Sequence, residues 1–252
     1  MIFTAEADGI RMQYLEFGHG EKTLVILPGL SVKSVLLYEE AIVPAYSVFA
    51  GEYTVRLFDR RLDVPDGYGI ADMAADTAAV MKSLGISDAC VFGVSQGGMI
   101  AQLLAASHPE LVKKLVLAST SSRMPDGLPF GGGSAGDRAD KFMKALYSDG
   151  FARAAGLSVT MPELTREELY RFDILSKASD GFDATEALRL IKCPTLVICA
   201  SDDAMIPASE SVRIANGLGC GLYVYGPPYG HAVYDEAPDF KNRVYEFLQR
   251  DK

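Results

Sequence analysis

Residues 89–107 read ACVFGVSQGGMIAQLLAAS, and this stretch decides the fold. Its first half is a short apolar run typical of a buried strand, and its second half has the apolar spacing of a helix. Between the two halves stands Gly93-Val94-Ser95-Gln96-Gly97. A very tight turn leaves no room for side chains two residues before and two residues after the serine, which explains Gly93 and Gly97. The stretch therefore predicts a strand, a sharp turn that presents Ser95, and a helix.

The same alternation of strand and helix continues on both sides of this stretch. Short, β-branched apolar runs alternate with longer segments of helical period, a pattern typical of a parallel sheet covered by helices on both faces. The predicted strands are residues 23–29, 53–59, 89–95, 114–120, 195–201 and 221–226. The predicted helices are residues 68–85, 96–107, 209–218 and 238–249. The predicted fold class is therefore α/β, with a mostly parallel, twisted sheet.

The N-terminal segment follows a different pattern. Residues 2–17 alternate apolar and polar side chains on both sides of Asp8-Gly9. An Asp-Gly pair supplies the positive backbone angles of a tight hairpin turn. We therefore expect an antiparallel hairpin ahead of the parallel strands.

One long segment interrupts the alternation. From Ser121 to Leu190 the sequence has no apolar strand run, only a Gly/Pro-rich loop and short amphipathic pieces. We expect a core made of residues 1–120 and 191–252, with residues 121–190, here called the cap segment, as a small helical insertion. Its apolar side chains either line a pocket for a small hydrophobic group or pack on one another. They include Phe130, Phe142, Met143, Tyr147, Phe151 and Met161.

A serine hydroxyl becomes a nucleophile when a base, normally histidine, accepts its proton. The chain has three histidines. His19 lies in a Gly-His-Gly turn and His108 precedes a proline that ends a helix, so both are interpreted as solvated turn residues. His231 follows the last predicted strand and thus emerges at the carboxyl edge of the sheet, where open α/β folds bind their ligands. We predict that Ser95 is the nucleophile and His231 its base.

The third member of such a site is a carboxylate that orients the imidazole. Asp203 closes the strand of residues 195–201 and gives the chain order Ser, Asp, His. Asp202 is the competing candidate, and either aspartate could instead cap a helix. The strand of residues 114–120 is a weaker source, because no carboxylate follows it until Asp126.

Acyl transfer also needs two backbone N–H groups directed at the oxyanion of the tetrahedral intermediate. One is expected from Gln96, directly after the nucleophile. The other is expected from Leu30, because Gly29 lets the loop after the first parallel strand approach closely. The alternative reading of this loop is a simple Pro-Gly turn.

Composition excludes several classes of function. The net charge is −9 and the pI is about 4.9, which argues against binding to nucleic acid or to an anionic membrane surface. No apolar window has the length of a membrane span, and the first residues do not resemble a secretory signal. We therefore expect a cytoplasmic protein, monomeric or homodimeric, that acts on a small molecule.

Four cysteines without a CxxC pair predict reduced, buried thiols and no metal site, and no cofactor is expected.

In this order and in these strand contexts, Ser95, Asp203 and His231 resemble the catalytic residues of the α/β-hydrolase superfamily. The resemblance covers nearly the whole chain. Proline stands four residues after Asp203, a spacing typical of the family's acid loop, which favours Asp203 over Asp202. The resemblance implies an α/β-hydrolase fold with a nucleophile elbow, an oxyanion hole and a catalytic triad.

Smaller motifs also resemble the family, with departures. Pro28-Gly29 stands where many members have His-Gly, and the FDRR of residues 58–61 stands where many have Asp-x-Arg-Gly. The serine nucleophile differs from the aspartate of the dehalogenase and epoxide-hydrolase branches.

The resemblance implies a serine esterase that forms an acyl-enzyme from a small, largely apolar substrate. Alternatives within catalysis are a lactonase, a carbon–carbon bond hydrolase, an amidase or aminopeptidase, and an acyltransferase. A different class is a ligand-binding module that uses the same pocket without turnover, because fold alone does not fix function.

Overall fold

The computed structural model describes residues 1–124, 133–154 and 162–250. Its strands form one eight-stranded sheet with the order β1-β2-β4-β3-β5-β6-β7-β8. The strands are β1 (Ile2–Ala7), β2 (Ile10–Phe17), β3 (Lys22–Leu27), β4 (Tyr53–Arg61), β5 (Ala89–Val94), β6 (Val112–Ala118), β7 (Thr195–Ala200) and β8 (Gly221–Tyr225). Each strand predicted from the sequence is present, which confirms the α/β fold class.

The N-terminal hairpin is confirmed as well. Strands β1 and β2 pair antiparallel, with Ala7 opposite Ile10, and the turn residues Asp8 and Gly9 have φ angles of 50° and 78°. Positive φ at both central residues is the geometry of a type I′ turn, which matches the right-handed twist of the strands. Strand β2 also pairs antiparallel with β4, whereas β4, β3, β5, β6, β7 and β8 are mutually parallel.

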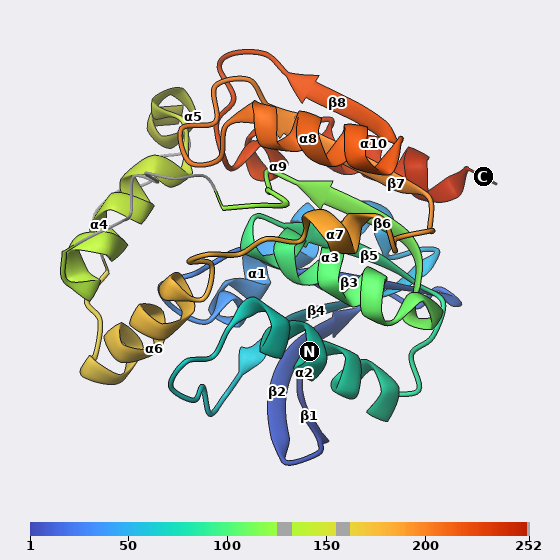
Figure 1. The fold of residues 1–252 in the computed structure, drawn as a ribbon, viewed down its shortest axis with the longest axis horizontal. Coiled ribbons are helices and arrows are strands. Elements are labelled where there is room, and N and C mark those ends of the chain that lie inside the picture. The colour runs from blue at the N-terminus through green and yellow to red at the C-terminus, as the bar shows by residue number, and fades with distance from the viewer. Residues whose placement is uncertain (125–132, 155–161, 251–252) are drawn as a thin grey trace.

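Helices cover both faces of the sheet (Figure 1). One face carries α2 (Ile70–Ser83), α3 (Gln96–Ser107), α7 (Thr185–Leu188) and α8 (Ala208–Leu218). The other face carries α1 (Glu39–Ala45), α9 (Val233–Glu236) and α10 (Phe240–Gln249). Short 3₁₀ turns at Val35–Tyr38, Ser47–Phe49 and Pro109–Leu111 complete the connections.

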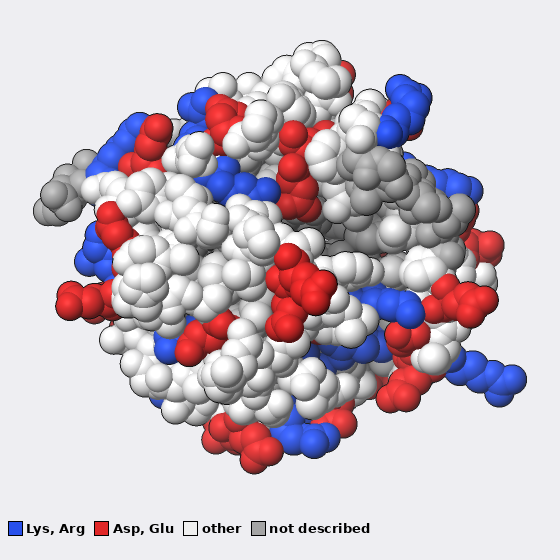
Figure 2. All heavy atoms as spheres, turned by 180° about the vertical axis from the view of Figure 1, so that it is seen from behind, with Lys and Arg blue, Asp and Glu red and all other residues white. Residues whose placement is uncertain are grey.

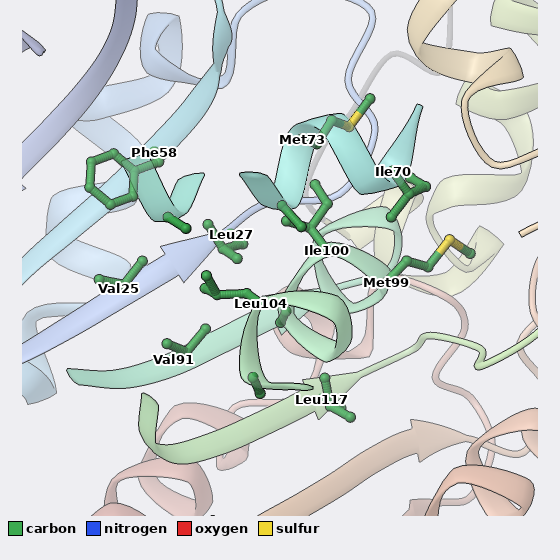
Figure 3. Packing of buried hydrophobic residues seen from close by; sticks show 14 of the residues in the cluster. Val25, Leu27, Phe58, Ile70, Met73, Val91, Met99, Ile100, Leu104 and Leu117 are labelled. Atoms are coloured by element: carbon green, nitrogen blue, oxygen red, sulfur yellow. The ribbon is translucent and has the colours of Figure 1, made fainter. Parts of the chain in front are cut away.

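Strand β5 is the centre of this three-layer arrangement, and all six of its residues are buried. Successive side chains point to opposite faces: Val91 packs with the α2 and α3 layer, whereas Cys90 and Phe92 pack with the α10 layer. Figure 3 shows the first of these layers, with the strand side chains directed at the two helices. Its labelled residues are Val25, Leu27, Phe58, Val91 and Leu117 from the strands, and Ile70, Met73, Met99, Ile100 and Leu104 from the helices.

The cap segment contains α4 (Ala135–Leu146), α5 (Asp149–Ala154), α6 (Arg166–Lys177) and α7, of which α7 packs with the helices on the sheet. In Figure 1, α4, α5 and α6 lie at the left, on the side to which the arrowhead of β6 points. Several of its apolar side chains pack on one another: Phe142 lies 6.2 Å from Phe172 between ring centroids. The rings of Tyr147 and Phe151 stack at 5.5 Å. Of the candidate pocket residues, Phe130 and Met161 lie outside the described residues.

Two features differ from the sequence-based expectations. Helix α1 was not predicted, because its seven residues include Pro44 and no fully buried side chain that would give an apolar stripe. All four cysteines are free, but only Cys90 and Cys199 are buried, and Cys193 and Cys220 are half-buried. The expectation that every thiol is buried was therefore wrong for those two.

The surface carries both signs of charge. On the face drawn in Figure 2, acidic and basic side chains are interspersed among uncharged ones. Within the part of the chain that the structure describes, no helix combines the length and apolar character needed to cross a bilayer.

Candidate active site

Four loops that carry the candidate residues meet at one edge of the sheet. They follow β3, β5, β7 and β8, which are parallel to one another. Parallel strands end on the same side, so residues far apart in the sequence come together there. The site therefore results from the topology of the sheet.

Ser95 has a strained backbone. It lies between β5 and α3 with φ 51° and ψ −122°, a conformation that costs a non-glycine residue about 1–3 kcal/mol. Neighbouring groups hold it in place: its N–H donates to the carbonyl of Ala118 at 2.9 Å, and its carbonyl accepts from the Thr120 hydroxyl at 2.7 Å. The end of β6 thus stabilises the turn that presents the hydroxyl of Ser95.

The two glycines of the turn are required by close backbone contacts. A Cβ on Gly97 would lie 2.0 Å from the carbonyl oxygen of Leu27, and one on Gly93 would lie 2.6 Å from the carbonyl oxygen of Gly97. Both distances are far below van der Waals contact. A side chain at Gly93 would push β5 and α3 apart, and one at Gly97 would push α3 away from the end of β3.

The three candidate catalytic side chains form a continuous hydrogen-bonded chain. His231 Nε2 lies 3.0 Å from Ser95 Oγ, and His231 Nδ1 lies 2.8 Å from Asp203 Oδ2. An ionised carboxylate only accepts hydrogen bonds, so Nδ1 carries the proton and donates to Asp203. That tautomer leaves Nε2 free to accept the proton of the Ser95 hydroxyl.

Asp203 is fixed on its other side by backbone groups. Its Oδ1 accepts hydrogen bonds from the N–H of Met205 at 2.8 Å and of Ile206 at 2.9 Å. The side chain is therefore both the imidazole partner and the support of its own loop. Asp202 instead is exposed, and its Oδ1 accepts from the hydroxyl of Ser201.

Burial separates these residues from the other histidines. The exposed fractions of Ser95, Asp203 and His231 are 8%, 7% and 1%. His19 is exposed, and His108 lies half-buried beside Lys82 and Glu110, at the opposite end of α3 from Ser95. Burial in a low-dielectric environment strengthens every interaction within the Ser-His-Asp chain.

The predicted oxyanion residues lie beside the nucleophile. Gln96 begins α3, and its N–H is one of the unpaired donors of a helix N-terminus. A Cβ on Gly29 would lie 3.1 Å from the Cβ of Ser95, so the loop that carries Gly29 and Leu30 passes against the turn. Gly29, Leu30 and Gln96 also line one small pocket together.

Sequence reasoning missed the role of the Gln96 side chain. Its Nε2 donates to the carbonyl of Leu175 at 2.7 Å and to Ser179 Oγ at 3.1 Å. Its Oε1 accepts from Arg60 Nη2 at 3.3 Å, and the same nitrogen donates to the carbonyl of Pro28 at 2.8 Å. Gln96 and Arg60 therefore connect the loop of Pro28 and Gly29, the turn at Ser95 and the end of α6. The FDRR motif was the only sequence signal for Arg60.

A second missed residue is Glu236, which is 7% exposed. Its carboxylate accepts from the N–H of Gly230 at 3.0 Å and from the N–H of Ser148 at 2.5 Å. Next to it, the N–H of Ala232 donates to the carbonyl of Leu146 at 3.0 Å. The residues on both sides of His231 are thus attached to the junction of α4 and α5, a long-range contact that no local motif indicates.

The described residues contain no cluster of side chains that could bind a metal ion. Within residues 1–124, 133–154 and 162–250, no group of three His, Cys, Asp or Glu side chains is placed to hold an ion. The side chains that converge on Ser95 instead suit proton transfer and attack on a carbonyl carbon.

Comparison with known proteins gives similarity over most of the chain. The model of the family described as alpha/beta hydrolase fold matches residues 23–172. A Mycobacterium tuberculosis protein named non-heme bromoperoxidase BpoC is 30% identical over 79% of this chain and 83% of its own length. A Rhizobium rhizogenes protein named carbamate hydrolase RutD is 27% identical over 82% of this chain and 86% of its own length.

Solved structures agree on the fold. The enol-lactonase from Burkholderia xenovorans LB400 superimposes with a TM-score of 0.82 at 20% identity, covering 98% of this chain and all of that one. The enzyme MGS-M2, from a deep-sea metagenome library, superimposes with a TM-score of 0.81 at 23% identity, covering 100% of this chain and 98% of that one.

Proposed function

This chain belongs to the alpha/beta hydrolase fold family, and on that premise we propose that it is a serine hydrolase that cleaves esters of small acyl groups. The observation that carries the proposal is the hydrogen-bonded chain from Ser95 Oγ through His231 to Asp203, with distances of 3.0 and 2.8 Å. Nucleophile, base and orienting acid are all within reach of proton transfer.

The mechanism follows from this geometry. Ser95 Oγ attacks the carbonyl carbon while its proton moves to His231 Nε2, and the carbonyl electrons move onto the oxyanion. The amides of Gln96 and Leu30 stabilise that oxyanion. The imidazolium then protonates the leaving alcohol, which breaks the ester bond and leaves an acyl-enzyme. Water, deprotonated by His231, attacks the acyl carbonyl and releases the acid and Ser95.

The names of two similar proteins also support a reaction at a carbonyl carbon. Carbamate hydrolase and enol-lactonase are names for proteins that cleave a bond at a carbonyl carbon carrying a heteroatom. The same attack by Ser95 would serve an ester, a lactone or a carbamate. We place simple esters first because they require no group beyond the residues already described. The cap segment, attached to the site through Gln96 and Glu236, would close over the bound acyl group.

The test is the hydrolysis of p-nitrophenyl acetate and butyrate by the wild type, by Ser95→Ala and by His231→Ala. We expect turnover by the wild type and a loss of kcat of at least about 10⁴-fold in both variants. His108→Ala, which changes a histidine outside the site, should keep wild-type activity. A folded wild type that hydrolyses neither ester, or a Ser95→Ala variant that still does so at the wild-type rate, would overturn the proposal.

A further inference from the structure

Arg60, at the end of β4, is a buried cation that forms no salt bridge within the described residues. Its exposed fraction is 6%, and within the described residues no carboxylate lies within ion-pair distance of its guanidinium. Nη2 donates to two uncharged oxygens, the carbonyl of Pro28 and Gln96 Oε1. Nε is buried and has no hydrogen-bond partner among these residues. Buried charges are normally paired, because desolvation of an unpaired charge is costly.

The other charges around Arg60 do have partners. Arg60 lines the small pocket beside Leu30 and Gln96, together with Lys33, Arg171 and one acidic residue, Asp59. Arg171 Nη2 lies 3.6 Å from Asp59 Oδ1, and Lys33 Nζ lies 3.5 Å from Glu168 Oε1. Burial lowers the pKa of Arg60 to about 10, which still leaves the guanidinium charged at neutral pH. The charge of nearby Asp59 also stabilises the guanidinium of Arg60, but Arg60 shares this carboxylate with Arg171. The pocket is lined by three cations, Lys33, Arg60 and Arg171, and by one carboxylate, so its net charge is positive.

This pocket adjoins the position of the reacting carbonyl. Leu30 and Gln96, the proposed oxyanion donors, line it together with Arg60. Its volume is about 10 Å³, close to the room that one water molecule needs. Such a space has room for a single oxygen atom of a substrate group but not for an extended apolar chain. Of the apolar side chains from which an apolar substrate was expected, Phe142 packs on Phe172 of α6, and Tyr147 stacks on Phe151.

We propose that Arg60 binds an anionic oxygen of the substrate, so that the preferred substrates are short esters whose acyl chain ends in a carboxylate. The inference rests on the proposed esterase function and adds a substrate class to it. A guanidinium is well suited to this role, because its planar donors match the geometry of a carboxylate. The anion would supply the salt bridge that Arg60 lacks within the described residues.

The test compares matched pairs of ethyl esters. Monoethyl succinate and ethyl 4-oxopentanoate differ in carrying a carboxylate or a methyl ketone, and monoethyl glutarate and ethyl 5-oxohexanoate form the next longer pair. We expect kcat/KM of the wild type to favour the carboxylate member of at least one pair by about 10–100-fold, the range of a charge-assisted hydrogen bond. Wild-type kcat/KM that is equal for both members of each pair, or higher for the ketone, would overturn the proposal.

Variants separate binding from positioning. Arg60→Met should bring the ratio of kcat/KM within each pair close to one, whereas Arg60→Lys, which keeps the charge, should retain part of the preference. If the role of Arg60 is purely structural, Arg60→Met will lower kcat/KM equally for both members of a pair and leave their ratio unchanged. That result would contradict the proposal. Arg56→Met is the matched control, because Arg56 lies on the same strand and pairs with Glu16 at 2.6 Å. Its ratio should equal that of the wild type.

A binding measurement keeps the inference distinct from the esterase proposal. In calorimetric titrations of the Ser95→Ala variant, monoethyl succinate or monoethyl glutarate should bind about 10–100-fold more tightly than its ketone analogue. Adding Arg60→Met should remove that difference. If p-nitrophenyl acetate is hydrolysed but no carboxylate preference exists in either assay, this inference fails and the esterase proposal stands. If no ester is hydrolysed but the binding preference exists, the esterase proposal fails and the binding of a carboxylate by Arg60 stands.

Discussion

Replacing Asp203 by asparagine tests how the site controls the protonation of His231. Asp203 Oδ1 accepts from two backbone N–H groups at 2.8 and 2.9 Å, and Oδ2 faces His231 Nδ1 at 2.8 Å. An asparagine has a single acceptor oxygen. The two backbone donors will retain that oxygen, so the amide NH₂ must point at the imidazole. Nδ1 then has to accept, the proton moves to Nε2, and the base that faces Ser95 is lost.

The expected cost follows from losing general-base catalysis while the fold is kept. We predict a decrease in kcat of about 10⁴-fold, equivalent to about 5 kcal/mol in the activation free energy. The assay is p-nitrophenyl acetate hydrolysis, together with a thermal unfolding curve to verify that the variant is folded. Asp202→Asn, at the exposed neighbouring position, is the control and should lose less than about twofold. If Asp203→Asn keeps more than a tenth of the activity, or Asp202→Asn loses as much, the reasoning is wrong.

Three further substitutions probe the surroundings of the site. Gly97→Ala places a Cβ 2.0 Å from the carbonyl oxygen of Leu27. It should lower the free energy of unfolding, measured in urea, by about 3 kcal/mol or more. Gly51→Ala, with open space around the new Cβ, should leave the free energy of unfolding unchanged. Gln96→Leu removes the hydrogen bonds to Leu175, in α6, and to Ser179, which follows it, and should lower the free energy of unfolding by about 1–3 kcal/mol. A urea unfolding curve with the same midpoint and slope as the wild type would contradict this. Glu236→Gln places an amide NH₂ against one of the two backbone N–H groups from which the carboxylate accepts hydrogen bonds. Because these bonds position the loop of His231, kcat should fall about tenfold with KM nearly unchanged. An unaltered kcat would contradict a positioning role of Glu236.

The parts of the site that local rules govern could be predicted from the sequence. The turn at Ser95 is recognisable because its constraints act within five residues, between a buried strand and a helix. His231 and the carboxylate were located by their position at the ends of strands, since the parallel sheet brings those ends together. The preference for Asp203 over Asp202 needed the family spacing, because both aspartates follow the same strand.

The parts that depend on long-range contacts could not be predicted. Gln96 bonds to Leu175, 79 residues away, and Glu236 bonds to Ser148, 88 residues away. No periodicity or local motif specifies such pairs, because they arise only when the cap segment folds against the sheet. Arg60 in the FDRR motif illustrates the same limit. The motif marks the residue, but only the structure shows that its guanidinium is buried, bonds to uncharged oxygens and forms no salt bridge within the described residues.

Covalent labelling with a serine-directed reagent shows directly whether Ser95 is an activated nucleophile. The folded wild type is incubated with a fluorophosphonate, its intact mass is measured, and the modified peptide is identified. We predict one adduct, on the peptide that contains Ser95, and none in the Ser95→Ala variant. A folded wild type that stays unlabelled, or a Ser95→Ala variant that is labelled equally fast, would mean that Ser95 is not the activated nucleophile.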